Sequence, residues 1–275
     1  MTNPTARAAP KSAKPQTPKF TAESIRKGRG YSPDRILLYG VEGIGKSSFA
    51  SEAPKPIFIA AEEGIKHIDA PRFEGLTKFD DVLEVLRLLF SEDLGYQTLV
   101  IDTIGWVEHR IHEQARQEAG MSLEKWNAYG HGVKHAMSYH RRLLFALDEI
   151  QRRRAMEVIL LAHAQVKNFP NPSGPDYNRY IPALQGDLTP DLYKQWADTV
   201  LFANYEDVVK ESEGIGKAKG IETGRRLLHT TRTAAWDAKS RWNLPPEIEM
   251  PKDGSYAAYA DARKTAGVYI ERSAS

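Results

Sequence analysis

The segment at 40–47, which reads GVEGIGKS, constrains this chain more than any other part of its sequence. It fits the pattern G-x-x-x-x-G-K-[ST] completely, and it stands between an apolar run at 35–39 and a helix-forming stretch that begins at Ser47. Glycines in such a loop let backbone N–H groups converge on phosphate oxygens, and the amino end of a helix adds positive potential. The segment therefore predicts a phosphate-binding loop between a strand and a helix.

The residue types in this loop predict individual contacts with a nucleotide. Lys46 is expected to reach the β- and γ-phosphates, and the hydroxyl of Ser47 is expected to bind Mg²⁺. The predicted nucleotide contacts on the loop are Gly40, Gly43, Gly45, Lys46, Ser47 and Ser48. The cofactors that follow from this set are ATP and Mg²⁺.

Apolar runs alternate with helical stretches along the rest of the chain. Strands are expected at 35–39, 56–61, 98–102 and 157–162, and helices at 79–90 and within 104–154, the latter interrupted near Gly120 and Gly130. This alternation predicts an α/β fold with a mostly parallel sheet covered by helices on both faces. After residue 190 the pattern changes to short runs, which predict an antiparallel β-extension.

Charge and composition divide the chain into three predicted parts. The 275 residues hold 38 basic and 36 acidic side chains, but eight of the basic and only two of the acidic ones lie in 1–35. Residues 1–28 are also rich in Pro and Ala, so we expect a disordered basic leader, which either aids solubility or touches nucleic acid. An ATPase core is expected over 29–250 and a C-terminal helix or tail over 251–275.

Several classes of protein are excluded by composition. The chain has no cysteine, which excludes a disulfide scaffold, a cysteine nucleophile and a thiolate metal site. No run approaches the roughly 18–20 apolar residues of a membrane span, and the N-terminal segment lacks the apolar middle of a secretory signal. A cytoplasmic protein without membrane contact is therefore expected.

Acidic residues follow two of the predicted strands. The run LVID ends in Asp102, which is expected to support Mg²⁺ at the carboxyl edge of the sheet. The next residue is Thr103, so the Asp-Glu pair of many ATPases is missing. The run PIFIAA is followed by Glu62 and Glu63, and one of these two carboxylates is predicted to polarise the attacking water.

Polar residues also follow the fourth predicted strand. His163 and Gln165 come directly after the apolar run EVILLA. Side chains at that position are expected near the γ-phosphate, where they could sense whether it is present. The alternative is that both side chains simply face solvent.

The segment that follows, at 167–180, reads KNFPNPSGPDYNRY and is predicted to be an irregular loop because of its prolines and glycine. Bases of a single strand stack on aromatic rings, while cations follow the phosphates. The candidate contacts with single-stranded DNA are Lys167, Phe169, Tyr177, Arg179 and Tyr180. The alternative is an ordinary surface loop or lid.

Over about 34–250 these motifs resemble the RecA-type recombinase ATPases, and more narrowly the phage proteins with a RecA core that act as single-strand annealing proteins (Sak type). In that family the strand ending apolar–Ala–Glu carries the catalytic glutamate, which favours Glu62 over Glu63. The family's strand-end glutamine, which couples nucleotide state to DNA loops, is matched by Gln165. The family's Lys-x-Lys pair, which reaches the ATP of the neighbouring subunit, is similar to Lys239 and Arg241.

The resemblance implies an ATPase stimulated by single-stranded DNA, with a role in phage-type recombination, annealing or repair. It also implies self-association into a ring or filament with ATP at the subunit interface. A phage single-strand-binding protein is a further expected partner. If the chain is encoded by a phage, its place is the cytoplasm of the host.

Two other functions remain open, and two are rejected. The open ones are a nucleotide-gated switch, such as a helicase loader with little hydrolysis, and a small-molecule kinase. The D-x-x-G pattern that starts at Asp102 is typical of GTPases, but no N-K-x-D guanine reader follows. The pairs His109/His112 and His131/His135 have ligand spacing, yet no acidic cluster joins them in the sequence, so no metal site is expected there.

Overall fold

The computed structural model of the protein describes residues 21, 24–25, 33–60, 68–210 and 219–268. Residues 1–31 and 32–275 form two separate units, and the architecture below concerns the second. The predicted basic leader at 1–28 lies almost entirely outside the described residues. The predicted catalytic candidates Glu62 and Glu63 also lie outside them.

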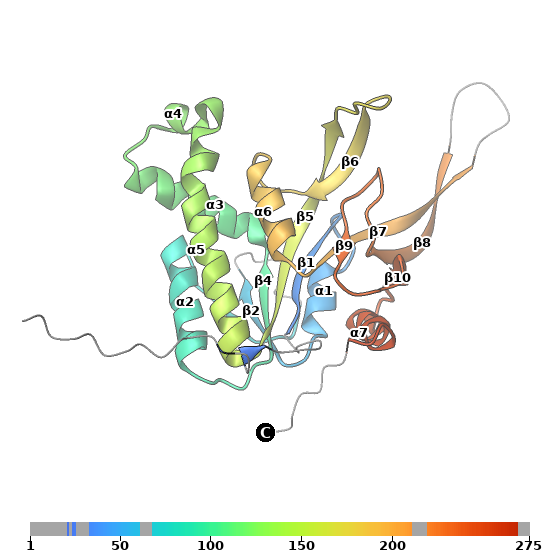
Figure 1. The fold of residues 1–275 in the computed structure, drawn as a ribbon, viewed down its shortest axis with the longest axis horizontal. Helices are drawn as coiled ribbons and strands as arrows, with labels where there is room; N and C mark the ends of the chain where they lie inside the picture. Colours follow the sequence, from blue (N-terminus) through green and yellow to red (C-terminus); the bar gives the residue numbers. More distant parts are fainter. Residues whose placement is uncertain (1–20, 22–23, 26–32, 61–67, 211–218, 269–275) are drawn as a thin grey trace, which may run out of the picture. The chain divides into compact units, whose positions relative to one another are not determined.

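At the centre of this unit, the described residues form a sheet of ten strands (Figure 1). Its parallel strands are β1 (Arg35–Gly40), β2 (Pro56–Ala60), β3 (Arg72–Phe73), β4 (Thr98–Asp102), β5 (Glu157–Phe169) and β7 (Thr199–Lys210). Its antiparallel strands are β6 (Tyr177–Pro182), β8 (Lys219–His229), β9 (Lys239–Ser240) and β10 (Glu247–Glu249). The main path runs β10-β8-β7-β1-β5-β4-β2-β3, so β5 separates β1 from β4.

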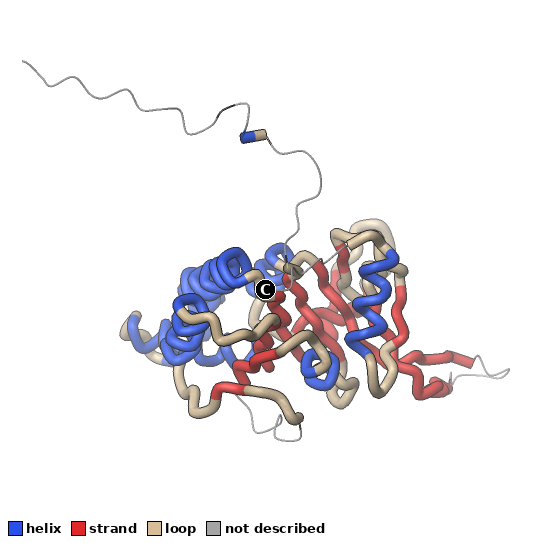
Figure 2. Tube along the Cα trace, turned by 90° about the horizontal axis from the view of Figure 1, so that it is seen from below, coloured by secondary structure: helices blue, strands red, loops and turns tan. Residues whose placement is uncertain are grey.

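Helices cover both faces of the sheet (Figures 1 and 2). They are α1 (Lys46–Ser51), α2 (Phe79–Ser91), α3 (Ile104–Glu118), α4 (Leu123–Asn127), α5 (His131–Arg154), α6 (Leu188–Trp196) and α7 (Ser255–Thr265), with a short 3₁₀ turn at Ala128–Gly130. None of these described helices is long and apolar enough to cross a membrane.

Alternation along the central strands divides the core into two layers. In β1, Leu37 and Tyr39 pack into the layer with α2, α3 and α5, while Ile36 and Leu38 pack into the layer with α1 and α7. Successive side chains of a strand point to opposite faces, so a strand buried on both faces must be apolar throughout. The predicted α/β class, with a mostly parallel sheet, helices on both faces and an antiparallel extension, is confirmed.

The predicted interruptions of the long helical region are also confirmed. Gly120 follows the end of α3 with φ of 59°, and Gly130 precedes α5 with φ of 70°. Glycine adopts this left-handed backbone without the steric cost that a Cβ imposes. The two glycines thus separate α3, α4 and α5.

The prediction of an irregular loop over 167–180 is wrong. Strand β5 continues to Phe169 and pairs with β6 in an antiparallel hairpin, with Phe169 opposite Tyr177 and Gln165 opposite Ile181. The residues that oppose regular structure are gathered in the connection at 170–176. The flanking residues keep their N–H groups for the ladder, so the prolines set the turn without preventing the strands.

Helix α7 is fastened to the core by buried charges. Arg263 is 2% exposed, and its Nη1 donates to Oε2 of Glu157 at 2.8 Å, while its Nη2 lies 3.8 Å from Oδ2 of Asp34. The hydroxyls of Tyr256 and Tyr259 donate to the same two carboxylates. Asp34 and Glu157 directly precede and begin the central strands β1 and β5, so α7 is bonded to the middle of the sheet.

Candidate functional site

The loop between β1 and α1 has the backbone that its glycines permit. Gly43 and Gly45 have φ of 72° and 101°, in the left-handed region that favours glycine. A Cβ on Gly40 would lie 2.3 Å from the carbonyl oxygen of Ala203 on β7, so only glycine allows this close approach of the strands. The loop therefore curls tightly from the carboxyl end of β1 into α1, as phosphate binding requires.

Lys46 is buried at the start of α1 and lies across the loop. Its Nζ donates to the carbonyl oxygens of Gly40 and Val41 at 3.0 and 2.9 Å. Burial lowers the pKa of Lys46, while the nearby carboxylates of Asp102 and Glu42 act in the opposite direction. The amine is thus held inside the loop by groups that a phosphate oxygen can replace.

Ser47 and Asp102 meet beside this loop. The Ser47 hydroxyl donates to Oδ2 of Asp102 at 2.5 Å, although the two residues lie on α1 and β4 with β5 between β1 and β4. A hydroxyl and a carboxylate are the oxygen ligands that Mg²⁺ prefers. The carbonyl oxygen of Ser48 accepts a hydrogen bond from the Ser51 hydroxyl within α1.

The loop, Lys46 and the Ser47–Asp102 pair together fit a nucleoside triphosphate with Mg²⁺.

Strand register brings the predicted site residues to one edge. Gly40 lies opposite His163 on β5, and Asp102 lies opposite Leu161 on β5 and Ala60 on β2. Ala60 is the last residue of β2, two positions before Glu62, whose role stays a prediction. His163 is half-buried, and its Nδ1 has no hydrogen-bond partner among the described residues.

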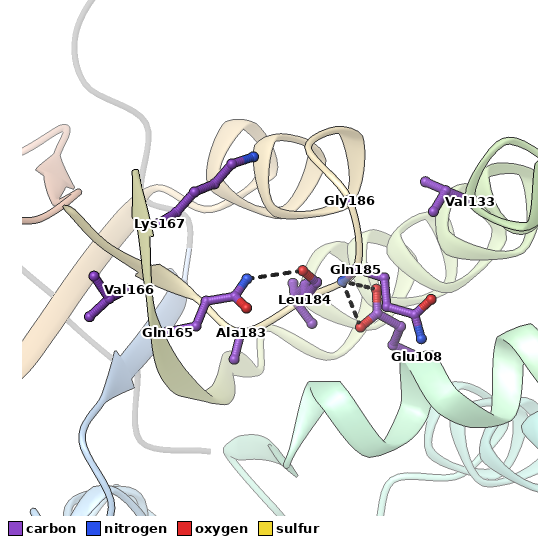
Figure 3. Close-up of a pocket in the computed structure, with 9 residues that line it drawn as sticks. All are labelled: Glu108, Val133, Gln165, Val166, Lys167, Ala183, Leu184, Gln185 and Gly186. Atoms are coloured by element: carbon purple, nitrogen blue, oxygen red, sulfur yellow. Dashed lines mark hydrogen bonds between the residues drawn. The ribbon is translucent and has the colours of Figure 1, made fainter. Parts of the chain in front are cut away.

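Gln165 lies two residues beyond His163, at the edge of a pocket of about 570 Å³ (Figure 3). Its Nε2 donates to the carbonyl oxygens of Leu184 and Pro182 at 3.2 and 3.3 Å. Across the pocket, both carboxylate oxygens of Glu108 accept from the backbone N–H of Gln185, at 2.9 and 3.1 Å. The segment between β6 and α6 is therefore held by Gln165 on one side and Glu108 on the other.

The five candidate DNA contacts fall into two groups. Arg179 is buried, with its guanidinium 4.9 Å from the ring centre of Phe169 and its Nη1 3.2 Å from Oδ1 of Asp237. Tyr180 is half-buried and stacks on Phe202 in the core, at 5.1 Å between ring centres. The structure thus makes Arg179 and Tyr180 supports of the hairpin.

The other three candidates lie at the outer part of the hairpin. Phe169 and Tyr177 stack on each other with ring centres 6.1 Å apart and planes inclined by 16°. The ammonium of Lys167 lies 5.9 Å from the Phe169 ring and forms an ion pair with Asp187. Each of these three side chains is partly exposed.

Lys239 and Arg241 lie beside the start of β7, near the end of β1 that is remote from the phosphate-binding loop. Strand β9 pairs with Thr199 and Val200, whereas Ala203 faces Gly40. Nζ of Lys239 donates to the carbonyl oxygen of Lys194 at 2.5 Å, and Nη1 of Arg241 lies 3.1 Å from Oδ1 of Asp198. The structure does not bring either cation to the loop of its own chain, and their action on a neighbouring subunit stays a prediction.

Arg226 is a further neighbour of the loop, and the sequence places it only among the many cations of the antiparallel extension, with phosphate contact and a solvated hairpin both open. It lies on β8, and its Nη1 donates to the carbonyl oxygen of Ile44 at 3.1 Å. Its Nη1 would also lie 2.8 Å from a Cβ on Gly45. No local pattern marks Arg226, because the contact depends on how the antiparallel extension folds back against β7.

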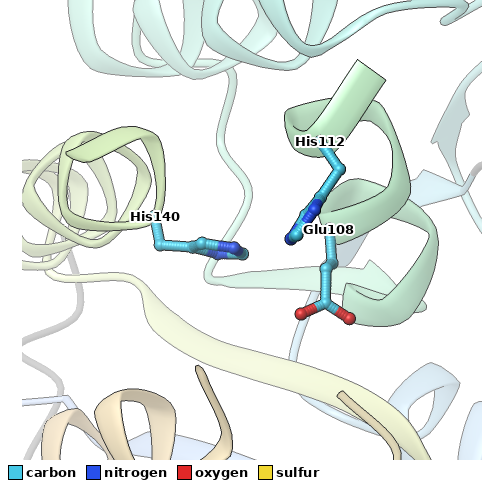
Figure 4. A group of neighbouring side chains, drawn as sticks. All are labelled: Glu108, His112 and His140. Carbon is cyan, nitrogen blue, oxygen red and sulfur yellow. The ribbon is translucent and has the colours of Figure 1, made fainter. Parts of the chain in front are cut away.

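A group that the sequence did not predict consists of Glu108, His112 and His140 (Figure 4). Glu108 and His112 are four positions apart, which puts a carboxylate and an imidazole on one face of α3. The sequence pattern paired His112 with His109 instead. In the structure His109 is exposed and lies 3.4 Å from Glu113. Burial raises the pKa of Glu108 to about 7 and lowers that of His140 to about 3.

The sequence matches a known domain family over most of its length. The sequence profile of an AAA domain family matches residues 32–242, most of the chain. The crystal structure of the RadB recombinase is similar at 13% sequence identity and a TM-score of 0.44, over 82% of this chain and 91% of that one. No curated protein matches the sequence. The match covers β1 through β9 with the loop, Asp102 and Gln165, and the chain therefore belongs to the AAA domain family of P-loop ATPases.

Proposed function

We propose that this chain is a Mg²⁺-dependent ATPase whose hydrolysis is coupled to the binding of single-stranded DNA, in recombination, annealing or repair of the phage type. Lys46 and the loop amides bind the phosphates, and Ser47 with Asp102 holds Mg²⁺. When bound, Mg·ATP supplies the phosphoryl group that is transferred to water. Glu62 is proposed to orient that water, and Gln165 to sense the γ-phosphate.

The observation that supports coupling is the continuity of β5. Leu161 lies beside Asp102, His163 beside Gly40, and Phe169 at the far end of the same strand, on the exposed hairpin. Gln165 lies between the two parts and bonds the segment that follows β6. A strand transmits a shift along its axis, so a change at the nucleotide edge reaches the hairpin without an intervening loop.

The hairpin has the chemistry of a single-strand contact. Phe169 and Tyr177 offer aromatic surface, Lys167 offers a cation, and the neighbouring Val166 is 56% exposed. The buried guanidinium of Arg179 lies 4.9 Å from the ring centre of Phe169 and 5.2 Å from that of Tyr177, and it holds both rings in place. Because the rings are already ordered, base stacking worth about 1–3 kcal/mol per base loses little entropy on binding.

The proposal includes self-association, in a ring or a filament with ATP at the interface. Lys239 and Arg241 are then the cations offered to the neighbour's nucleotide. Each is held in place within its own chain, Lys239 by the carbonyl oxygen of Lys194 and Arg241 by Asp198. Held cations of this kind can stabilise developing charge without reorganising.

The test is steady-state ATP hydrolysis with and without a single-stranded oligonucleotide, at two salt concentrations. Single strands are expected to stimulate hydrolysis several-fold, and the effect should weaken with salt because phosphate contacts release counterions. The double variant Phe169→Ala/Tyr177→Ala should bind the oligonucleotide at least about 10-fold more weakly, given the stacking energy per base. Its hydrolysis without DNA should stay near that of the unchanged chain.

Phe145→Ala is the matched control, because Phe145 is an exposed aromatic on α5 and is 67% accessible. It should leave both DNA binding and stimulation intact. Hydrolysis that depends on Lys46 but ignores DNA would contradict the coupling and favour a nucleotide-gated switch. Phosphate transfer to a small acceptor in place of water would favour a kinase.

A further inference from the structure

We propose that Glu108, His112 and His140 form a binding site for a divalent transition metal ion, with Zn²⁺ as the best-fitting ion. The site lies between α3 and α5, apart from the phosphate-binding loop, and is independent of the proposed action on DNA. It would add a second metal to a protein whose nucleotide already implies Mg²⁺. Two imidazoles and a carboxylate are a ligand set that Zn²⁺ takes in proteins, with one position left for water.

The three side chains point toward one another (Figure 4). One ligand atom from each residue lies within 4.8 Å of the other two. In a tetrahedral site with bonds of 2.0–2.1 Å, ligand atoms are about 3.3 Å apart. The side chains therefore need to close by only about 1–1.5 Å around an ion, which rotation about χ angles can supply without moving the helices.

The three polar side chains are almost completely buried, which is unusual for a carboxylate and two imidazoles. Glu108, His112 and His140 are 3%, 6% and 0% exposed. The Nε2 atoms of both histidines are buried and have no hydrogen-bond partner among the described residues. A buried polar atom without a partner costs about 1–3 kcal/mol, and an ion between the three residues would satisfy both nitrogens at once.

The surroundings orient two of the three ligands. Nδ1 of His140 lies 2.9 Å from the hydroxyl of Tyr193, and when it donates there its Nε2 lone pair faces the cluster. The carboxylate of Glu108 is fixed by the N–H of Gln185 and also lines the 570 Å³ pocket, which gives an ion a route to the site (Figure 3). Both features are typical of a metal centre with an ordered outer shell.

Metal binding requires a change in the protonation of the His112 ring. Nε1 of Trp126 lies 3.2 Å from Nδ1 of His112, and an indole can only donate, so Nδ1 accepts and Nε2 carries the proton in the metal-free chain. Coordination at Nε2 transfers this imidazole proton to Nδ1 or to solvent, and in the first case the two N–H groups oppose each other. In that first case the indole hydrogen bond competes with the ion, and the indole N–H of Trp126 must turn away from Nδ1.

The experiment uses the full chain without an affinity tag, stripped with a chelator and titrated with Zn²⁺ alone in a competition assay with a zinc dye. One equivalent is expected to bind and to raise the unfolding temperature. His140→Gln and Glu108→Gln should each weaken binding at least about 100-fold, more than the loss of an outer-shell partner. Trp126→Phe keeps an aromatic ring but removes the competing donor, so it should tighten binding.

Co²⁺ in place of Zn²⁺ gives a second readout, because tetrahedral Co²⁺ has intense visible absorption that the His140→Gln variant should lose. The matched control is His109→Ala/His131→Ala, which removes one exposed histidine from each of α3 and α5 and should leave the tight site unchanged. Binding that is lost in this control and kept in His140→Gln would overturn the proposal. Absence of tight binding in the unchanged chain and in Trp126→Phe would overturn it as well.

Discussion

Lys46→Ala is expected to reduce ATP hydrolysis by about 100- to 1,000-fold, the loss seen when one group that stabilises transition-state charge is removed. Lys46 is the buried cation of the loop, and within the described part of the chain its ammonium donates to the carbonyl oxygens of Gly40 and Val41. Alanine at this position leaves the phosphates without that charge in a site that excludes much of the solvent. The measurement is the steady-state rate of phosphate release at saturating Mg·ATP.

Lys252→Ala is the matched control for this loss, because Lys252 is an exposed lysine beyond the β-extension. It should hydrolyse ATP at the rate of the unchanged chain. The helix content of Lys46→Ala should also be unchanged, which separates a lost contact from a lost fold. A Lys46→Ala rate within a few-fold of the unchanged chain would mean that hydrolysis happens elsewhere.

The largest expected loss of stability comes from Arg263→Met, about 3–5 kcal/mol in the free energy of unfolding. Methionine fills most of the volume, but it leaves Glu157 without its charged partner and removes the nearest cation from Asp34. Both carboxylates are buried, so neither can recover its hydration in the folded protein. The measurement is equilibrium unfolding in urea at pH 7.

Lys264→Met is the control, since Lys264 follows Arg263 on α7 and is exposed. Its free energy of unfolding should change by less than about 0.5 kcal/mol. The double variant Arg263→Met/Glu157→Gln should recover part of the loss, because a neutral amide replaces one unpaired carboxylate. A loss below about 1 kcal/mol in Arg263→Met would show that α7 does not depend on the buried pair.

The parts of the structure that the sequence predicts well depend on short segments. The strand, loop and helix around 35–51 are encoded by an apolar run, glycines and a lysine that are neighbours in the chain. Asp102 follows its strand directly, and parallel strands end at one edge, so its approach to Ser47 follows from the topology. Gly120 and Gly130 mark the ends of helices for an equally local reason.

The parts that were missed depend on contacts between distant segments. Arg179 looks like an available cation in its own segment, and its burial depends on Asp237, 58 residues away. The same holds for His140, which reaches Glu108 and His112 only because α5 packs against α3. The β5–β6 hairpin is predicted as a loop for another reason. Its prolines lie in the connection at 170–176, and they do not prevent strand pairing on either side of it.

Equilibrium binding of ATP, with Mg²⁺ and with a chelator, shows whether Ser47 and Asp102 form the metal side of a nucleotide site. Mg²⁺ is expected to tighten ATP binding to the unchanged chain, and Ser47→Ala should lose most of this gain while still binding ATP without metal. ATP binding that ignores Mg²⁺ in the unchanged chain, or an equal Mg²⁺ gain in Ser47→Ala, would contradict this role of the two residues.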